Sequence, residues 1–125
     1  MYFRKVTAVI LTIIVFLCHI IPGDKITLFQ WDALFAIDKI FHFLLFGILS
    51  ISYLIYFYSF VLEKKHILYT ICIVFFYGLF LEFLQEIVFV YRNFDIMDLF
   101  ADMAGSVFFL FCFVKLKLNK YFKLD

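Results

Sequence analysis

Four long and almost uncharged stretches limit what this chain can fold into more than any other feature of its sequence. Each is close to the roughly 20 apolar residues with which an α-helix crosses the hydrocarbon core of a bilayer. The stretches cover approximately residues 6–22, 40–62, 67–90 and 98–114. Of the whole chain, 67% is hydrophobic and 17% charged, against about 45–50% and about 25% in soluble domains. We therefore predict an all-α integral membrane four-helix bundle, with one domain over residues 1–125.

The net charge and the positions of the cysteines exclude some classes of function. The formal net charge of +1 lacks the basic excess of nucleic-acid-binding proteins, so we expect no nucleic-acid partner. The three cysteines, Cys18, Cys72 and Cys112, lie inside apolar stretches without a CxxC pair, which favours membrane-buried thiols. The sequence also contains no glycine-rich phosphate loop, nucleophile elbow or internal repeat, so no standard motif assigns a reaction.

The first apolar stretch follows Arg4 and Lys5, an arrangement that is also typical of a secretory signal. No small-x-small cleavage site follows it, and Pro22-Gly23 forms a stop and turn signal. We interpret the stretch as a retained first span.

Lysine and arginine residues predict the orientation of the bundle. They concentrate at the N-terminus, between the second and third spans, and in the C-terminal tail. These residues are Arg4, Lys5, Lys64, Lys65, Lys115, Lys117, Lys120 and Lys123. Because basic residues favour the cytoplasmic side, we expect both termini and the second connection in the cytoplasm. The first and third connections then face outward.

A scattered set of polar residues lies in or beside the apolar stretches. Its members are Asp38, His42, Glu82, Gln85, Glu86, Arg92, Asp98 and Asp102. The expected topology places all of them near the outer face of the membrane. Ionisable side chains at such depth are costly and need partners or a function, so we expect them to share one site.

Helical periodicity supports that expectation. Gly78 and Glu82 fall on one face of the third span, and Ala101, Asp102 and Gly105 share a face of the fourth. Ala101 and Gly105 have the small-xxx-small spacing that lets membrane helices approach closely. The polar faces are therefore also close-packing faces.

At these residues the chain resembles the VanZ-like family of small bacterial membrane proteins. The matching pieces are Asp38-Lys39-Ile40-Phe41-His42-Phe43, Glu82-Phe83-Leu84-Gln85, Arg92, Asp98-Leu99 and Gly105. The resemblance covers about residues 20–110 and departs at two positions. Asp102 stands where the family commonly has Asn, which adds a carboxylate, and Phe109 stands where it often has a second Gly, which we expect to loosen helix packing.

The resemblance implies a multi-pass protein of the bacterial plasma membrane that acts at the cell envelope. The family is named after a protein that gives low-level resistance to the glycopeptide teicoplanin. No settled chemistry comes with the resemblance, and we expect membrane lipids as partners, with a lipid-linked cell-wall intermediate as a further candidate.

Two interpretations of the polar set stay open. In the first, the set forms an outward-facing pocket for an envelope component. Its proton-handling or catalytic candidates are Glu82, His42 and Asp98, and its binding candidates are Asp38, Lys39, Gln85, Arg92 and Asp102. In the second, the set is a structural ion-pair network of a non-catalytic scaffold or partner-binding module. Asp38 could orient the His42 imidazole, or merely stabilise a helix start while His42 reaches the interface.

Metal binding also stays open. Asp98, Asp102, Glu82 and His42 supply oxygen and nitrogen atoms that suit Mg²⁺, Mn²⁺ or Zn²⁺. No ligand-spacing motif of a known metalloenzyme is present, so the sequence identifies no cofactor. Arg92 could instead clasp a phosphate or carboxylate of a lipid-linked substrate.

Overall fold

Four helices make up the fold in the computed structural model, which describes residues 2–20, 31–57, 62–88 and 93–121. They are α1 (Tyr2–Ile20), α2 (Trp31–Phe57), α3 (Lys64–Val88) and α4 (Ile96–Tyr121). The described residues contain no strand, and each helix is long and apolar enough to cross a membrane. The predicted all-helical membrane fold is confirmed.

Two helices are longer than the apolar pattern predicts. α2 begins at Trp31 rather than near residue 40, and α4 continues to Tyr121 rather than ending near residue 114. Residues 31–37 contain alanine and leucine without glycine or proline, and residues 115–120 are mostly leucine and lysine. These are good helix formers, so each helix extends beyond the part that is apolar enough for hydrocarbon.

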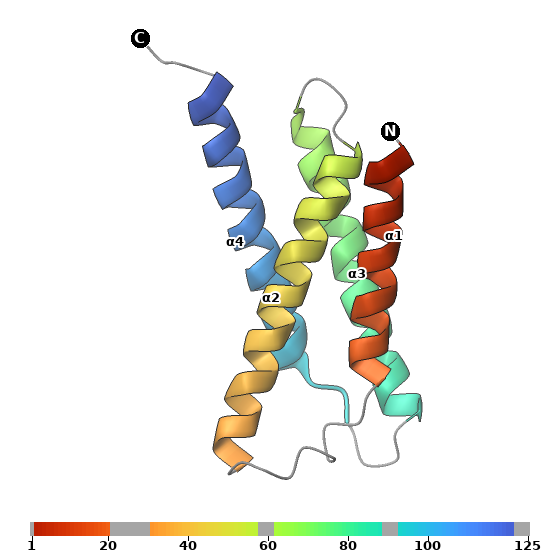
Figure 1. Ribbon diagram of the computed structural model, residues 1–125. Helices are drawn as coiled ribbons and strands as arrows, with labels where there is room; N and C mark the ends of the chain where they lie inside the picture. Colours follow the sequence, from red (N-terminus) through yellow and green to blue (C-terminus); the bar gives the residue numbers. More distant parts are fainter. Residues whose placement is uncertain (1, 21–30, 58–61, 89–92, 122–125) are drawn as a thin grey trace.

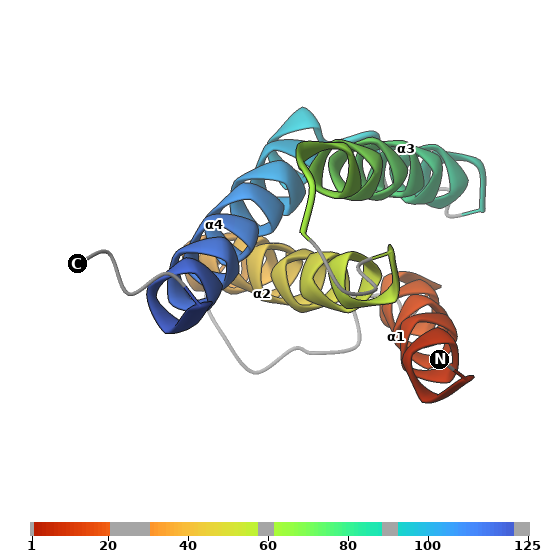
Figure 2. The same cartoon turned by 90° about the horizontal axis from the view of Figure 1, so that it is seen from above.

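The helices run alternately up and down, so α1 begins and α4 ends at the same end of the bundle (Figure 1). α2 lies at the centre and packs against α1, α3 and most extensively α4, whereas α1 and α4 make no contact within the described residues. Seen from above, α4 crosses α2 obliquely and diverges from α3 (Figure 2). This topology brings the end of α1, the start of α2, the end of α3 and the start of α4 to one end.

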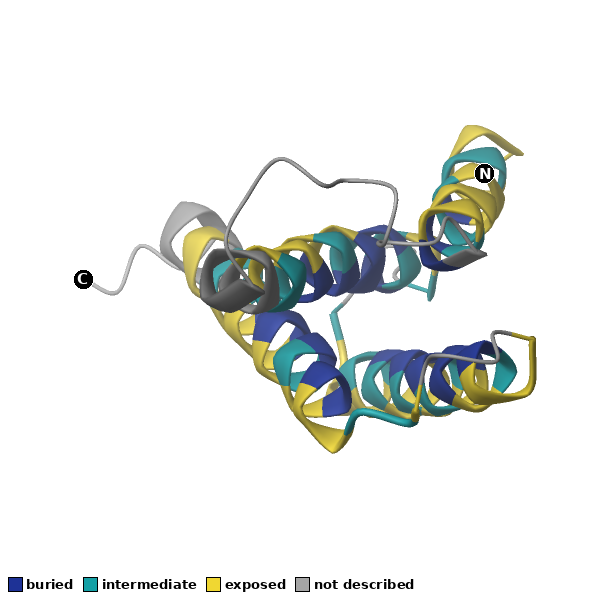
Figure 3. Ribbon diagram, turned by 90° about the horizontal axis from the view of Figure 1, so that it is seen from below, coloured by how far each residue is buried: buried dark blue, intermediate teal, exposed yellow. Residues whose placement is uncertain are grey.

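Apolar packing holds the middle of the bundle together. Val15, Phe46, Leu49, Val74 and Leu81 form its buried core. Buried residues lie on the helix faces turned toward one another, and exposed residues lie outside (Figure 3). Many exposed side chains are large and apolar, as expected of a surface that faces lipid. Since lipid tails are as apolar as leucine, close packing and hydrogen bonds hold such helices together.

Glycines set the close approach of α2 and α4. A Cβ added at Gly105 would lie only 2.8 Å from the Cα of Phe43 on α2, so no larger residue fits at this position. The ring of Phe109 lies over Gly47, where an added Cβ would be 2.5 Å from Cδ2 of Phe109. Phe109 therefore does not prevent close packing, because a glycine on the opposite helix gives its ring the space.

Candidate functional site

Buried and half-buried polar side chains from all four helices gather at the end of the bundle away from the start of α1. We call this set the polar end. Its members are His19 of α1, Asp38, Lys39 and His42 of α2, Glu82 and Gln85 of α3, and Asp95, Asp98 and Asp102 at the start of α4. They lie in the second half of α1 and α3 and in the first half of α2 and α4, and the up-and-down topology brings these parts of the helices together.

A lysine joins α2 to the start of α4. Nζ of Lys39 donates to Oδ1 of Asp98 at 2.7 Å and to Oδ2 of Asp95 at 3.0 Å. The Asp98 side chain is 4% exposed and that of Lys39 31%, so a nearly buried carboxylate meets a cation at the bundle surface. The partner of Asp98 is thus a lysine of α2.

Asp95 caps α4. Its Oδ1 accepts a hydrogen bond from the backbone N–H of Met97 at 2.8 Å, the usual bond of a residue that precedes a helix. Partial burial raises the pKa of Asp95, but the Met97 N–H and the Lys39 ammonium outweigh it, so the pKa falls below the ordinary 3.8. Asp95 therefore carries a charge that helps to hold Lys39.

A buried histidine–aspartate pair forms the second link between α2 and α4. Nδ1 of His42 lies 2.9 Å from Oδ1 of Asp102, and because a carboxylate accepts, Nδ1 carries the donated proton. Oδ1 of Asp38 lies 4.0 Å from Nε2 on the other side of the ring. The carboxylate that orients His42 is therefore Asp102 rather than Asp38.

The alternative of a helix start does not hold for Asp38 and His42. α2 begins at Trp31, so Asp38 lies within the helix and not at its N-terminus. His42 is 4% exposed and does not extend to the membrane surface.

Glu82 lies inside the bundle, as the cost of a lipid-facing carboxylate predicts. The residue is 1% exposed, and its Oε2 accepts the backbone N–H of Asp95 at 3.2 Å. Its other oxygen, Oε1, is buried and has no hydrogen-bond partner among the described residues. Burying a polar oxygen without a partner is expensive, so this atom is a candidate contact for a ligand.

Gln85 and His19 connect α3 to α1. The amide of Gln85 donates to the backbone oxygen of His19 at 3.0 Å. The His19 ring lies edge-on to the His42 ring, with centroids 4.7 Å apart, and Nδ1 donates to the carbonyl of Val15 at 2.7 Å. A histidine of the first span thus belongs to the polar end.

Gly78 gives Asp102 its space. An added Cβ at Gly78 would lie 2.8 Å from Oδ2 of Asp102, and this oxygen is buried without a hydrogen-bond partner among the described residues. The glycine that shares a helical face with Glu82 therefore lets the Asp102 carboxylate reach the middle of the site.

The structure places seven of the eight predicted site residues together: Asp38, Lys39, His42, Glu82, Gln85, Asp98 and Asp102. Arg92 lies outside the described residues, and Glu86 is exposed on α3. Sequence reasoning missed His19 and Asp95. The signals that could have found them are the position of His19 near the end of the first span and the position of Asp95 just before an apolar stretch.

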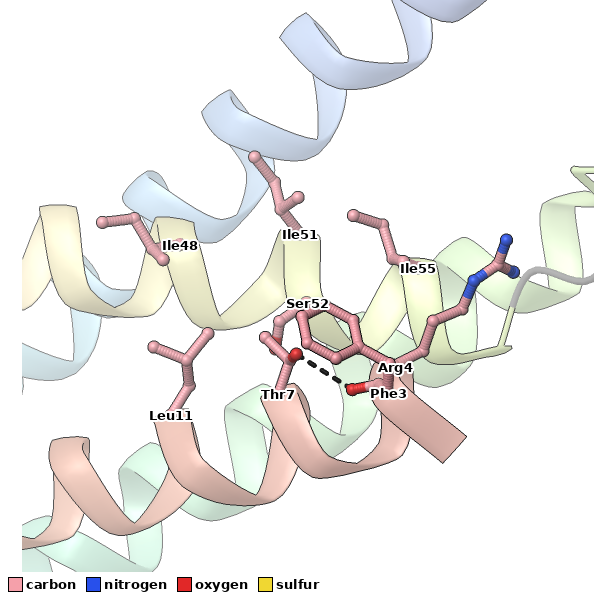
Figure 4. A pocket seen from close by; sticks show the side chains of 8 residues that line it. All are labelled: Phe3, Arg4, Thr7, Leu11, Ile48, Ile51, Ser52 and Ile55. Carbon is pink, nitrogen blue, oxygen red and sulfur yellow. Dashed lines mark hydrogen bonds between the residues drawn. The ribbon is translucent and has the colours of Figure 1, made fainter. Parts of the chain in front are cut away.

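A cavity of about 310 Å³ lies elsewhere, between α1 and α2 (Figure 4). Its lining is Phe3, Arg4, Thr7, Leu11, Ile48, Ile51, Ser52 and Ile55. It shares no residue with the polar end, and apart from Arg4 it carries no charge. A groove of this kind suits an acyl chain rather than ionic chemistry, so the candidate site is defined by the polar end.

The fold and this site define a class: a small multi-pass membrane protein with ionisable residues buried at one end of its helices. The chain belongs to the VanZ/LLP1 family, whose model matches residues 3–118, nearly the whole sequence. Curated proteins and solved structures gave no match.

Proposed function

We propose that this protein resides in a bacterial plasma membrane and binds, at its polar end, the headgroup of an envelope lipid or lipid-linked cell-wall intermediate. The observation that carries the proposal is the burial of Glu82, 1% exposed, with one carboxylate oxygen unpartnered among the described residues. A purely structural network gains nothing from that oxygen, whereas a polar ligand would satisfy it.

The distribution of basic residues assigns the polar end to the outer side in this proposal. The polar end lies opposite the start of α1, where Arg4 and Lys5 flank the first span. By the positive-inside rule that start is cytoplasmic. A headgroup reaching the site would then come from the outer leaflet, where late cell-wall intermediates are exposed.

Chemistry at the site would use the buried groups already in contact. The Asp102 carboxylate holds the His42 imidazole in one orientation, and Glu82 is buried at the same end of the bundle. His42 and Glu82 are thus the candidates for moving a proton on a bound headgroup, with Asp98 holding Lys39 beside them. A change in an exposed cell-wall intermediate would also alter susceptibility to teicoplanin.

A specific observation favours a second candidate, a non-catalytic scaffold. The Lys39–Asp98 and His42–Asp102 pairs both link α2 to α4, and such pairs can fix the register of two helices. In that case the polar end would hold the bundle or a partner interface, and envelope effects would follow only from loss of the folded protein.

A matched pair of variants separates the two candidates. Glu82→Gln removes the buried charge, and Glu86→Gln makes the same change at an exposed position of the same helix. Cells expressing each variant are compared for teicoplanin susceptibility, for the lipids that copurify with the protein, and for the amount of protein in the membrane.

If the proposal is correct, Glu82→Gln reaches a normal protein level but no longer retains the specific lipid or alters teicoplanin susceptibility. Glu86→Gln behaves as wild type. If Glu82→Gln retains both properties, or loses them only in proportion to its protein level, the scaffold explanation is correct.

A further inference from the structure

We propose that Asp38, His42 and Asp98 bind one divalent transition-metal ion, Mn²⁺ or Zn²⁺, at the polar end. One ligand atom from each residue lies within 4.8 Å of the other two. Atoms bonded to one ion at about 2.0–2.2 Å lie at most about 4.4 Å apart, so the three side chains must move closer together to bind one ion. The inference rests on the proposed function only for the role of the ion, which would be to neutralise carboxylates and hold a headgroup oxygen.

The orientation of His42 is that of a metal ligand. Metal-binding histidines usually donate their second ring N–H to a carboxylate, which fixes the ring and its tautomer. Nδ1 of His42 makes this bond to Asp102, which is 1% exposed. Nε2 is left with its lone pair, 4.0 Å from Oδ1 of Asp38.

Lys39 occupies only part of Asp98. The ammonium donates to Oδ1, and a carboxylate has a second oxygen for an ion. An ion bound by that oxygen and a lysine on the first oxygen can therefore coexist, with Lys39 fixing the carboxylate in place.

Glu82 supplies the independent observation that a cation is needed. The residue is 1% exposed, and its Oε1 has no hydrogen-bond partner among the described residues. Oδ2 of Asp102 lies against Gly78, one helical turn before Glu82 on α3, so Glu82 lies beside the carboxylate that holds His42. Asp102 also has a buried oxygen, Oδ2, without a hydrogen-bond partner among the described residues, and a divalent ion would offset the repulsion between these carboxylates.

The donor set selects the kind of ion, and its position allows entry. Carboxylate oxygens with one imidazole nitrogen suit Mn²⁺ and Zn²⁺ better than the softer ions that prefer thiolates. The side chain of Asp38 is 42% exposed while those of His42 and Asp98 are nearly buried. Asp38 thus lies at the edge of the site, where an ion can enter.

The full chain is purified in detergent and stripped of metal with EDTA. It is then titrated with MnCl₂, and free Mn²⁺ is measured by electron paramagnetic resonance. Mn²⁺ avoids the three cysteines because it binds thiols poorly. We expect one saturable ion per chain, displaced by Zn²⁺. Asp38→Asn should weaken binding about tenfold or more, and Asp102→Asn about 10- to 100-fold.

Two controls make the result decisive. Glu63→Gln changes an exposed carboxylate that pairs with Lys65 at the other end of the bundle, and its affinity should equal that of wild type. Asp38→Asn changes the side-chain charge with almost no change in volume, and its melting temperature is measured so that only folded protein is compared.

Absence of saturable Mn²⁺ and Zn²⁺ binding, or equal binding by folded Asp38→Asn, overturns the metal site. Because no lipid enters this titration, such a result leaves the lipid-retention test of Glu82→Gln unaffected. Retention of the lipid by Glu82→Gln, with intact metal binding by the wild type, would instead overturn the proposed function alone.

Discussion

Two polar networks cross this bundle, and they differ in charge and in completeness. In the middle, the Thr12 hydroxyl lies 2.9 Å from the Tyr53 hydroxyl, and Tyr77 donates to the Thr12 carbonyl at 2.8 Å. This network is neutral and links α1, α2 and α3 directly. At the polar end the groups are charged, and oxygens of Glu82 and Asp102 are buried without partners among the described residues.

The comparison shows how a membrane protein separates cohesion from function. Neutral hydroxyl bonds hold helices together at little cost, since they leave no charge in a medium of low dielectric. Charged groups with open bonding positions cost stability, so their persistence at one end needs another reason. We infer that the middle network serves the fold and the polar end serves a ligand, and the following predictions test that division.

The largest effect is expected at the close contact between α2 and α4, beside the polar end. Gly105→Leu would place a side chain against the backbone of Phe43 and force α2 from α4, at a cost of about 3 kcal/mol or more. Membrane levels should fall sharply and the purified protein should melt earlier. Ala104→Leu, at an exposed neighbour, is the control, and similar behaviour of both variants would refute the close contact.

The next effect is the loss of the cation at the polar end. Lys39→Met leaves Asp98, 3% exposed, without its ammonium, and we expect a loss of about 1–3 kcal/mol in thermal unfolding. Adding Asp98→Asn should recover part of it, because no charge is then left unpaired. A double variant as unstable as the sum of the single ones would contradict the pairing.

The middle network should give a smaller and purely structural change. Tyr77→Phe removes one hydrogen bond and should cost about 0.5–1.5 kcal/mol. Lipid retention and Mn²⁺ affinity should stay at wild-type values. If Tyr77→Phe disturbs either property, the two networks are coupled and the division is wrong.

The smallest effect is a dependence on pH at the edge of the polar end. Asp95 has a folded-state pKa below its ordinary 3.8, so its ionised form contributes stability above about pH 4. That contribution disappears as the pH falls through the lowered pKa. Wild type should therefore lose more melting temperature below about pH 4 than Asp95→Asn does, by a small margin because the side chain is 37% exposed. Equal losses would show that Lys39 does not hold Asp95.

Hydropathy sufficed for much of this architecture. Apolar length predicts four helices, and the alternation of their direction places Asp38, Glu82 and Asp98 at one end before any contact is known. Hydropathy does not predict which polar side chains pair with each other. Which carboxylate meets His42 depends on the rotation and tilt of α4 against α2, and these are set by Gly105 rather than by hydropathy.

Local chemistry explains the remaining differences. Asp95 joins the site through a backbone cap, which an apolar pattern does not register. The start of α2 at Trp31 reflects helix propensity outside the hydrocarbon. Phe109 keeps α2 and α4 together only because Gly47 lies opposite, a pairing that neither residue predicts alone.

The central claim, that residues of α2 and α4 meet in one buried site, has a direct test. With Cys18, Cys72 and Cys112 replaced by serine, the pair His42→Cys and Asp102→Cys is treated with dibromobimane, which fluoresces only after joining two thiols. The account predicts strong fluorescence for this pair and none for Leu44→Cys with Ala104→Cys, two exposed positions on the same helices. Absence of fluorescence from the pair at positions 42 and 102, or equal fluorescence from both pairs, would contradict the account.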